Sequence, residues 1–183
     1  MAQEPSTAMK ADEELMAAVA LGDRGAFSLL VTRYQDAIWR AAWRYTGNAE
    51  DARDICQTVF LKLYEAGSRY KISATFKTYL FRITNNTCID HYRKKRPEAT
   101  NDPVEVADSA PLPDEMLEEH KRGRGLRFAI SQLPQRQRRA LILRYEADLR
   151  VKEIAEVMGS TQKTVERLLA HAREALRENA IQR

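Results

Sequence analysis

The sequence is short of the residues that break helices and of those that cross-link small folds. Its 183 residues include only 7 glycines and 6 prolines, and no strand-like alternation persists, which predicts an all-α chain. Cys56 and Cys88 are too few for a disulfide framework and have no metal-ligand spacing, so they fit a reducing cytoplasm. With no apolar run of membrane-spanning length and no visible signal peptide, we expect a cytoplasmic protein without membrane insertion.

The residue patterns of common enzymes are also missing. His91, His120 and His171 have no ligand spacing with the cysteines, and we find neither a Ser/His/Asp arrangement nor a glycine-rich phosphate loop. We therefore expect no enzyme activity, no metal and no cofactor. A small nuclease is kept as an alternative, but the absence of a plausible metal cluster in the sequence counts against it.

Charge is distributed unevenly, although the net charge is only +4. Between Pro97 and Glu119 every charged residue is acidic: Glu98, Asp102, Glu105, Asp108, Asp114, Glu115, Glu118 and Glu119. Basic residues precede this segment at 93–96, and others follow it: Lys121, Arg122, Arg124, Arg127, Arg136, Arg138, Arg139 and Arg144. Two basic blocks around an acidic spacer indicate two modules that face a polyanion, joined by a segment that avoids DNA.

Prolines divide the chain into two small helical domains. Pro97, Pro103, Pro111 and Pro113 interrupt helix where the sequence is acidic and poor in aromatics, which predicts a flexible linker over 97–113. We therefore expect one domain over residues 1–96 and another over 114–183.

The segment from Val151 to Arg173 has the pattern of a helix-turn-helix. A short amphipathic helix ends at Gly159, because glycine enters the left-handed conformation without a Cβ penalty, and Ser160 or Thr161 can cap a longer helix. The expected apolar stripes are Val151, Ile154, Ala155 and Met158 in the first helix and Val165, Leu168, Leu169, Ala172 and Leu176 in the second. The second helix has a polar face of Gln162, Lys163, Glu166, Arg167, Ala170 and His171. Such a helix fits the DNA major groove, although an ordinary αα-hairpin remains the alternative.

Four helices are expected in the first domain, over Ala11–Leu21, from a cap at Asp23 to about Tyr45, from a cap at Asn48, and from Phe76 to about Lys95. Their inward positions are Leu15 and Val19; Phe27, Leu30, Tyr34, Ile38 and Ala41; Ala52, Ile55, Cys56, Val59 and Leu63; and Phe76, Leu80, Ile83 and Thr87. Two outward stripes are candidates for binding: Glu50, Asp54, Gln57 and Leu61, and Arg82, Asn86, Ile89 and Arg93 with Tyr79 and Asp90 beside them. Either stripe can instead be a solvated face. The basic loop Ala66–Thr75 before the fourth helix adds to the second candidate.

In the second domain, the first expected helix carries Leu117, Leu126, Phe128, Ile130 and Leu133, although Gly123 and Gly125 weaken this prediction. Pro134 fits the first position of the next helix, which runs to about Glu146. That helix is expected to bury Ala140, Leu141 and either Leu143 or the stem of Arg144, and to display Arg136 and Arg139.

Taken in order, these segments resemble the extracytoplasmic-function (ECF) group of RNA polymerase sigma factors in the sigma-70 family. The matching stretches are Leu21–Tyr34, Gly47–Tyr64, Phe76–Arg96, Leu133–Tyr145, Glu153–Gly159 and Thr164–Leu176. Each stretch alone is weakly specific, whereas their order and spacing around the linker are highly specific. The match covers nearly everything except the termini and the linker.

The resemblance implies the partners and the site residues. Such proteins bind core RNA polymerase, through the clamp coiled coil of its largest subunit and its flap, and carry it to promoter DNA. The clamp-binding residues would be Glu50, Asp51, Asp54, Gln57 and Leu61. The −10 element would be read and melted by Arg69, Tyr70, Lys71, Tyr79, Arg82, Asn86, Arg93 and Lys94, with Asp90 on the same helix. The −35 element would be read by Gln162, Lys163, Glu166, Arg167, Ala170, His171 and Arg173. The family also implies an anti-sigma partner.

The sequence departs from the family pattern at a few of these positions. Thr58 stands where many relatives have Glu after the clamp-helix Gln57. Glu166, Arg167 and His171 also differ from the usual recognition helix, so the −35 sequence cannot be copied from relatives. A helix-turn-helix repressor or activator of duplex operators is the alternative function. It would explain the second domain but neither the −10-like helix nor the clamp-like stripe.

Overall fold

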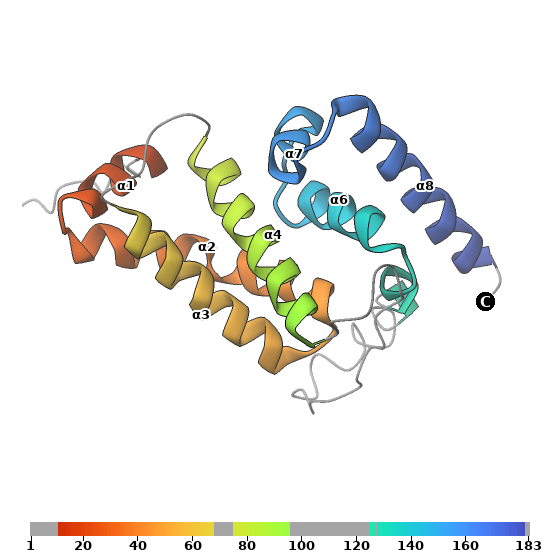
Figure 1. The fold of residues 1–183 in the computed structure, drawn as a ribbon, viewed down its shortest axis with the longest axis horizontal. Coiled ribbons are helices and arrows are strands. Elements are labelled where there is room, and N and C mark those ends of the chain that lie inside the picture. The colour runs from red at the N-terminus through yellow and green to blue at the C-terminus, as the bar shows by residue number, and fades with distance from the viewer. Residues whose placement is uncertain (1–10, 68–74, 96–124, 127, 182–183) are drawn as a thin grey trace, which may run out of the picture.

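Every regular element in the described part of the chain is helical, as the sequence predicts. The computed structural model describes residues 11–67, 75–95, 125–126 and 128–181. The helices are α1 (Asp12–Ala20), α2 (Arg24–Thr46), α3 (Ala49–Ala66), α4 (Phe76–Lys95), α6 (Gln135–Tyr145), α7 (Val151–Met158) and α8 (Gln162–Ile181) (Figure 1). No helix within these ranges is long and apolar enough to cross a membrane. The predicted linker over 97–113 lies outside the described residues.

The predicted caps set the boundaries of the helices in the first domain. The Asp23 side chain accepts from the backbone N–H of Ala26 at 3.0 Å, so α2 begins directly after it. Gly47 ends α2 in the left-handed conformation at φ 70°. Asn48 then accepts from the N–H groups of Glu50 and Asp51 at 2.8 and 3.0 Å. This cap starts α3 and reverses the chain, which allows α3 to pack against α2.

The core of the first domain follows the predicted apolar stripes with small departures. Leu30, Ile38, Ile55, Leu63 and Leu80 are each at most 1% exposed between α2, α3 and α4. The predicted inward residues Phe27, Cys56 and Ile83 are only half-buried. These three lie at the margins of the helix contacts, where the stripe turns towards the surface.

In the second domain, the turn before α6 differs by one position from the prediction. Pro134 is the N-cap of α6 and not its first residue, because its ψ of 140° is extended. The side chain of Arg138 folds back over this turn and donates to the carbonyl oxygens of Ile130 and Leu133 at 3.2 and 3.0 Å. Arg138 is 1% exposed, although the sequence placed it in an exposed basic block.

The helix-turn-helix forms as predicted, although the buried face of its first helix is broader than expected. Gly159 adopts φ 59° between α7 and α8. In α7, Val151 and Met158 are half-buried, whereas Val157 is only 5% exposed. The cause is that α7 packs against α8 on one side and against α4 of the first domain on another, so it buries two faces.

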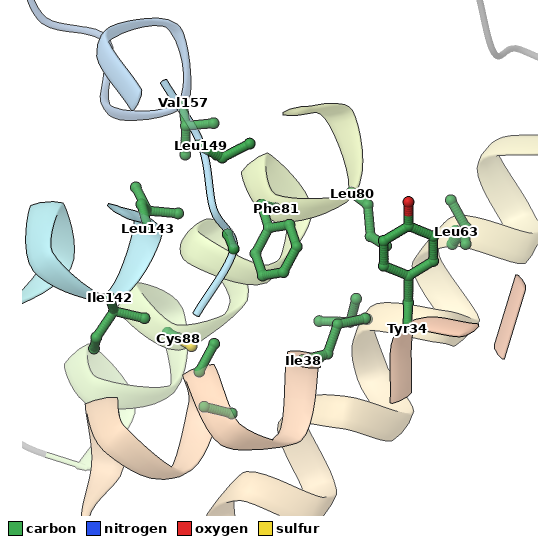
Figure 2. Close-up of a cluster of buried hydrophobic side chains, with 14 of the residues drawn as sticks. Tyr34, Ile38, Leu63, Leu80, Phe81, Cys88, Ile142, Leu143, Leu149 and Val157 are labelled. Atoms are coloured by element: carbon green, nitrogen blue, oxygen red, sulfur yellow. The ribbon is translucent and has the colours of Figure 1, made fainter. Parts of the chain in front are cut away.

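The two domains share one hydrophobic core. Phe81 of α4 lies with Leu143 from α6, Leu149 from the following loop and Val157 from α7 (Figure 2). In Figure 1, α4 lies between the other helices of the first domain and the α6–α7 pair. The domains are therefore packed side by side, an arrangement that the sequence did not predict.

Candidate nucleic-acid and partner-binding surfaces

The recognition helix α8 has one buried and one exposed face. Val165, Leu169 and Ala172 are at most 2% exposed and anchor the helix to its own domain. Every predicted −35 residue lies on the exposed side: Gln162, Lys163, Glu166, Arg167, Ala170, His171 and Arg173. The Thr161 hydroxyl caps the helix by accepting from the N–H of Thr164 at 3.2 Å. The first turns of α8 are thus fixed in orientation, with their side chains free to enter a groove.

The side chains on this face can discriminate between bases. Arg167 has a planar guanidinium that can donate two parallel hydrogen bonds to a guanine in the major groove. Glu166, next to it, can accept from a cytosine amino group and would repel a phosphate. Lys163 lies one turn earlier and adds positive charge for the backbone. The exposed face therefore carries side chains whose chemistry suits both base readout and phosphate attraction.

A second polar surface runs along α4. Arg82, Asn86, Arg93 and Lys94 are exposed there. The Arg82 guanidinium lies 5.5 Å from the centre of the Tyr79 ring, a cation–π contact that orients both side chains. The other predicted −10 residues, Arg69, Tyr70 and Lys71, lie outside the described residues.

One residue of this surface was missed in the sequence. Lys62 of α3 donates to the hydroxyl of Thr87 at 3.2 Å and lies 3.9 Å from the carboxylate of Asp90. Lys62 follows Leu61 directly in the sequence, so helical periodicity places it beside the exposed stripe of α3. Periodicity within α3 does not indicate which residues of α4 it contacts. Its ammonium group partly neutralises the one acidic side chain predicted on the −10 stripe.

The other side of α4 faces the second domain. Thr78, Phe81, Asn85 and Cys88 are each at most 6% exposed. Asn85 accepts from the Nε of Arg139 at 2.9 Å. The prediction that Arg139 is displayed to solvent is wrong in this arrangement, since α6 turns it towards α4, and burial lowers the pKa of its guanidinium. Burial likewise raises the pKa of the Cys88 thiol to about 12.

A third surface is the outer face of α3. Glu50, Asp54 and Gln57 are exposed along it, and Leu61 is 58% exposed. Asp51 differs from these residues because it is half-buried and lies 3.3 Å from the Nε2 of His91 on α4. The exposed stripe therefore has two carboxylates and an amide, followed at its C-terminal end by an apolar side chain.

Aromatic and apolar side chains extend this surface beyond the predicted residues. Tyr64 is 44% exposed and packs edge-on against Phe27 with ring centres 5.1 Å apart. Leu29 of α2 is also 51% exposed. Contiguous exposed apolar patches mark contact surfaces, whereas single exposed apolar residues are ordinary, so Leu61 and Tyr64, one turn apart on α3, are the better candidates for a contact. Within the described ranges, no three His, Cys, Asp or Glu side chains are grouped so that they could hold a metal ion.

Comparison with known proteins places both domains in one family. Residues 30–98 match Sigma-70 region 2, and residues 124–176 match Sigma-70, region 4. The chain is 31% identical to the ECF RNA polymerase sigma factor SigW of Bacillus subtilis (strain 168), over 87% of this chain and 91% of that protein. It is 32% identical to the ECF RNA polymerase sigma-E factor of Escherichia coli (strain K12), over 93% and 94%.

The solved structures agree with these sequence matches. The chain resembles CnrH, solved in complex with the cytosolic domain of CnrY, with a TM-score of 0.70 and 27% identity over 92% of this chain and 96% of that one. It shares the fold of RpoE, solved with the anti-sigma factor NepR from Bartonella quintana, with a TM-score of 0.66 at 19% identity over 84% and 96%.

Proposed function

The chain belongs to the ECF group of RNA polymerase sigma factors, and from this membership we propose how its surfaces divide the work of promoter recognition. As a sigma factor, it binds core RNA polymerase and directs promoter-specific initiation of transcription. The first domain, residues 1–96, binds polymerase and recognises the −10 element. The second domain, residues 114–183, reads the −35 element. Residues 97–113 connect the two.

The observation that carries this proposal is the arrangement of α8. All seven predicted −35 residues are exposed, and the apolar residues between them are buried against α6 and α7. This arrangement supports a reading helix that its own domain holds rigidly, as major-groove recognition needs. Within it, Arg167 clamps a guanine and Glu166 selects against other bases at the neighbouring position.

The exposed stripe of α4 reads the −10 element differently. There the duplex must open, and a base that leaves the stack needs aromatic and guanidinium surfaces to stack against. Arg82 and Tyr79 already form such a stacked pair at 5.5 Å. Asn86 adds an amide one turn away, and Arg93 and Lys94 attract the backbone. The loop residues Arg69, Tyr70 and Lys71 complete this surface in our proposal.

The outer face of α3 binds the clamp coiled coil of the largest polymerase subunit. Glu50, Asp54 and Gln57 supply acceptors for basic and polar groups, and Leu61 supplies an apolar anchor of the kind that contributes most to interface energy. Asp51 contributes indirectly, by holding α3 to α4 through His91. The second domain contacts the polymerase flap.

The partners and the cellular setting follow from the same membership. The chain acts in the cytoplasm on polymerase and promoter DNA and has no chemistry of its own. Two solved relatives are complexes with CnrY and with the anti-sigma factor NepR. They support control of this chain by an anti-sigma factor as well.

Reconstituted transcription tests the proposal. The protein is mixed with core polymerase and fragmented genomic DNA, and the initiation sites are mapped. We expect initiation that depends on the protein, at sites that share two sequence elements. Positions −10 and −35 are about 25 base pairs apart, which corresponds to roughly 85 Å of duplex. A protein that binds duplex operators tightly without polymerase and supports no initiation would be a repressor or activator, and the proposal would fail.

A further inference from the structure

Helix α4 begins against α1, the first helix of the same domain. The Glu13 carboxylate accepts from the backbone N–H of Phe76, the first residue of α4, at 3.0 Å. The Phe76 side chain is 0% exposed, and Glu13 is half-buried beside it. The two residues are 63 positions apart in the sequence, so no pattern within either helix indicates this contact. Glu13 therefore caps α4 from a different helix.

The first turn of α4 needs partners from outside the helix. The first N–H groups of any helix have no acceptor within it, and they carry a partial positive charge. The Thr75 hydroxyl accepts from the N–H of Thr78 at 3.2 Å, and Glu13 accepts from that of Phe76. The first turn of α4 contains no acidic residue and includes Lys77. Glu13 therefore supplies both an acceptor and the negative charge that this helix end lacks.

Helix α1 is itself held firmly in place. The Asp12 carboxylate accepts from the guanidinium of Arg33 and from the hydroxyl of Tyr34, both on α2. Burial and the bond to Asp12 raise the pKa of Tyr34, so its hydroxyl stays protonated and keeps donating. The Tyr34 ring in turn packs against that of Phe76, with ring centres 5.6 Å apart. Side chains of α1, α2 and α4 thus meet at the first residue of α4.

The same helix also contacts the end of α3. A Cβ atom on Gly67, which follows α3, would lie 3.3 Å from Cγ1 of Val19, so only glycine fits here without displacing α1. In Figure 1, α1 lies beside the C-terminal end of α3. Val19 and Glu13 are only about 9 Å apart along α1, whereas the chain from Gly67 to Phe76 could extend over about 30 Å. Contact with α1 therefore brings the end of α3 and the start of α4 closer together than the chain length requires.

The −10 surface depends on the first turn of α4 through Tyr79. The N–H of Tyr79 donates to the carbonyl of Thr75 at 3.0 Å, a bond that exists only while this turn is helical. The Tyr79 ring lies 5.5 Å from the guanidinium of Arg82. Helix ends fray when their terminal groups lose their partners, and a frayed turn would release Tyr79 from this pair. Recognition of a base requires side chains that are fixed to within a fraction of an ångström.

We infer that Glu13 is a positioning residue for −10 recognition. Its hydrogen bond to the N–H of Phe76 fixes the first turn of α4 and keeps Tyr79 in the orientation that stacks on a base. The inference rests on the proposed reading of the −10 element by α4. Loss of the bond should therefore change which −10 sequences are selected, while reading of the −35 element by α8 stays the same.

Amide hydrogen exchange followed by NMR tests the contact in the full chain without polymerase. Glu13→Ala removes the acceptor, whereas Glu13→Gln keeps a carbonyl oxygen at the same position. Glu14→Ala is the matched control, because Glu14 has the same charge on the same helix but is exposed. We expect Glu13→Ala to speed exchange of the Phe76 and Tyr79 amides by about tenfold and to leave the amides of α8 unchanged. Glu13→Gln and Glu14→Ala should remain near the parent protein.

Competitive transcription tests the consequence for selectivity. Two libraries are built on one promoter mapped with the parent protein, the first randomised at the −10 element and the second at the −35 element, and each template carries a transcribed barcode. We expect Glu13→Ala holoenzyme to lose about fivefold of its preference for the favoured −10 bases and none of its −35 preference. All templates compete in one reaction, so a smaller amount of folded protein would lower the yield without changing the preference.

The outcomes separate this inference from the proposed function. Unchanged −10 preference in Glu13→Ala, or equal losses of −10 and −35 preference, would overturn the positioning role while initiation by the parent protein still supports the proposed function. Equal losses in Glu13→Gln and Glu13→Ala would exclude the hydrogen bond as the cause. If the parent protein supported no initiation, the proposed function would fail and the −10 role would fail with it, whereas the exchange rates would still show whether Glu13 fixes the start of α4.

Discussion

Replacing Arg138 by methionine tests whether a buried guanidinium holds the start of the second domain together. Arg138 is 1% exposed and donates to the carbonyls of Ile130, Leu133 and Tyr45 at 3.2, 3.0 and 3.4 Å. Its Nη2 also donates to the carbonyl of Ser131. Burial lowers the pKa of the guanidinium, because its charged form loses hydration there. The bonds fix the turn that precedes α6.

The size of the effect follows from these bonds. Methionine preserves much of the side-chain stem but has no donor, so it leaves the carbonyls unpaired in a region that water enters poorly. A hydrogen bond from a charged donor contributes about 1.5–3 kcal/mol, but the bonds share one guanidinium and are not additive. The cost of removing the guanidinium charge from water, several kcal/mol, offsets part of the stabilisation that these hydrogen bonds provide. We therefore expect a loss of about 3–5 kcal/mol in the free energy of unfolding.

Urea denaturation followed by circular dichroism measures this loss. Arg136→Met is the matched control, because Arg136 lies on the same helix but is exposed, and its replacement should cost less than about 0.5 kcal/mol. Arg138→Lys keeps the charge without the planar fork, so it should fall between the two. If the free energies of unfolding of Arg138→Met and Arg136→Met differed by less than about 1 kcal/mol, the hydrogen bonds from Arg138 to the carbonyl oxygens would not stabilise the turn.

Three further predictions concern the proposed binding surfaces and a helix cap. Arg167→Ala should weaken promoter binding by about 1–3 kcal/mol and relax selection at one −35 position, whereas a run-off assay with unchanged preference would contradict the assignment. Asp54→Ala combined with Gln57→Ala should weaken binding to core polymerase, measured by co-elution. Leu61→Ala should reduce the binding free energy by about 1–2 kcal/mol, whereas Leu61→Met should leave it unchanged. Retained co-elution of these variants would exclude α3 as the clamp surface. Asn48→Ala should lower the free energy of unfolding by about 1 kcal/mol, and Asn48→Asp should lower it by much less, because only alanine removes the acceptor for the first turn of α3. Urea denaturation measures both changes.

Local signals in the sequence were sufficient for most of the helices. Asp23, Gly47, Asn48 and Gly159 act where their chemistry predicted, because caps and left-handed turns depend on a few adjacent residues. The exposed faces of α8 and of α3 also follow directly from helical periodicity. Pro134 was misplaced by one position because its fixed φ is compatible with both the N-cap and the first helical residue.

Side chains that reach across to another element could not be predicted in this way. Lys62 bonds to Thr87 on α4, and Arg138 reaches the carbonyl of Tyr45 in the other domain. Periodicity assigns such residues to a face of their own helix but does not show what lies opposite that face. An arginine in a basic block therefore looked exposed when it is the most deeply buried charge of the described chain.

The sequence by itself determined the all-α class. It also predicted a division into two helical modules and the residues offered to DNA and polymerase, because such predictions depend on local pattern and order along the chain. The packing of the modules was decided only in three dimensions. Phe81 and Val157 are far apart in sequence, and each could equally have closed the core of its own domain. Only the tertiary contact of α4 with α6 and α7 shows that the two modules are held together. That contact depends on complementary shape and charge across an interface, which no spacing within one helix encodes.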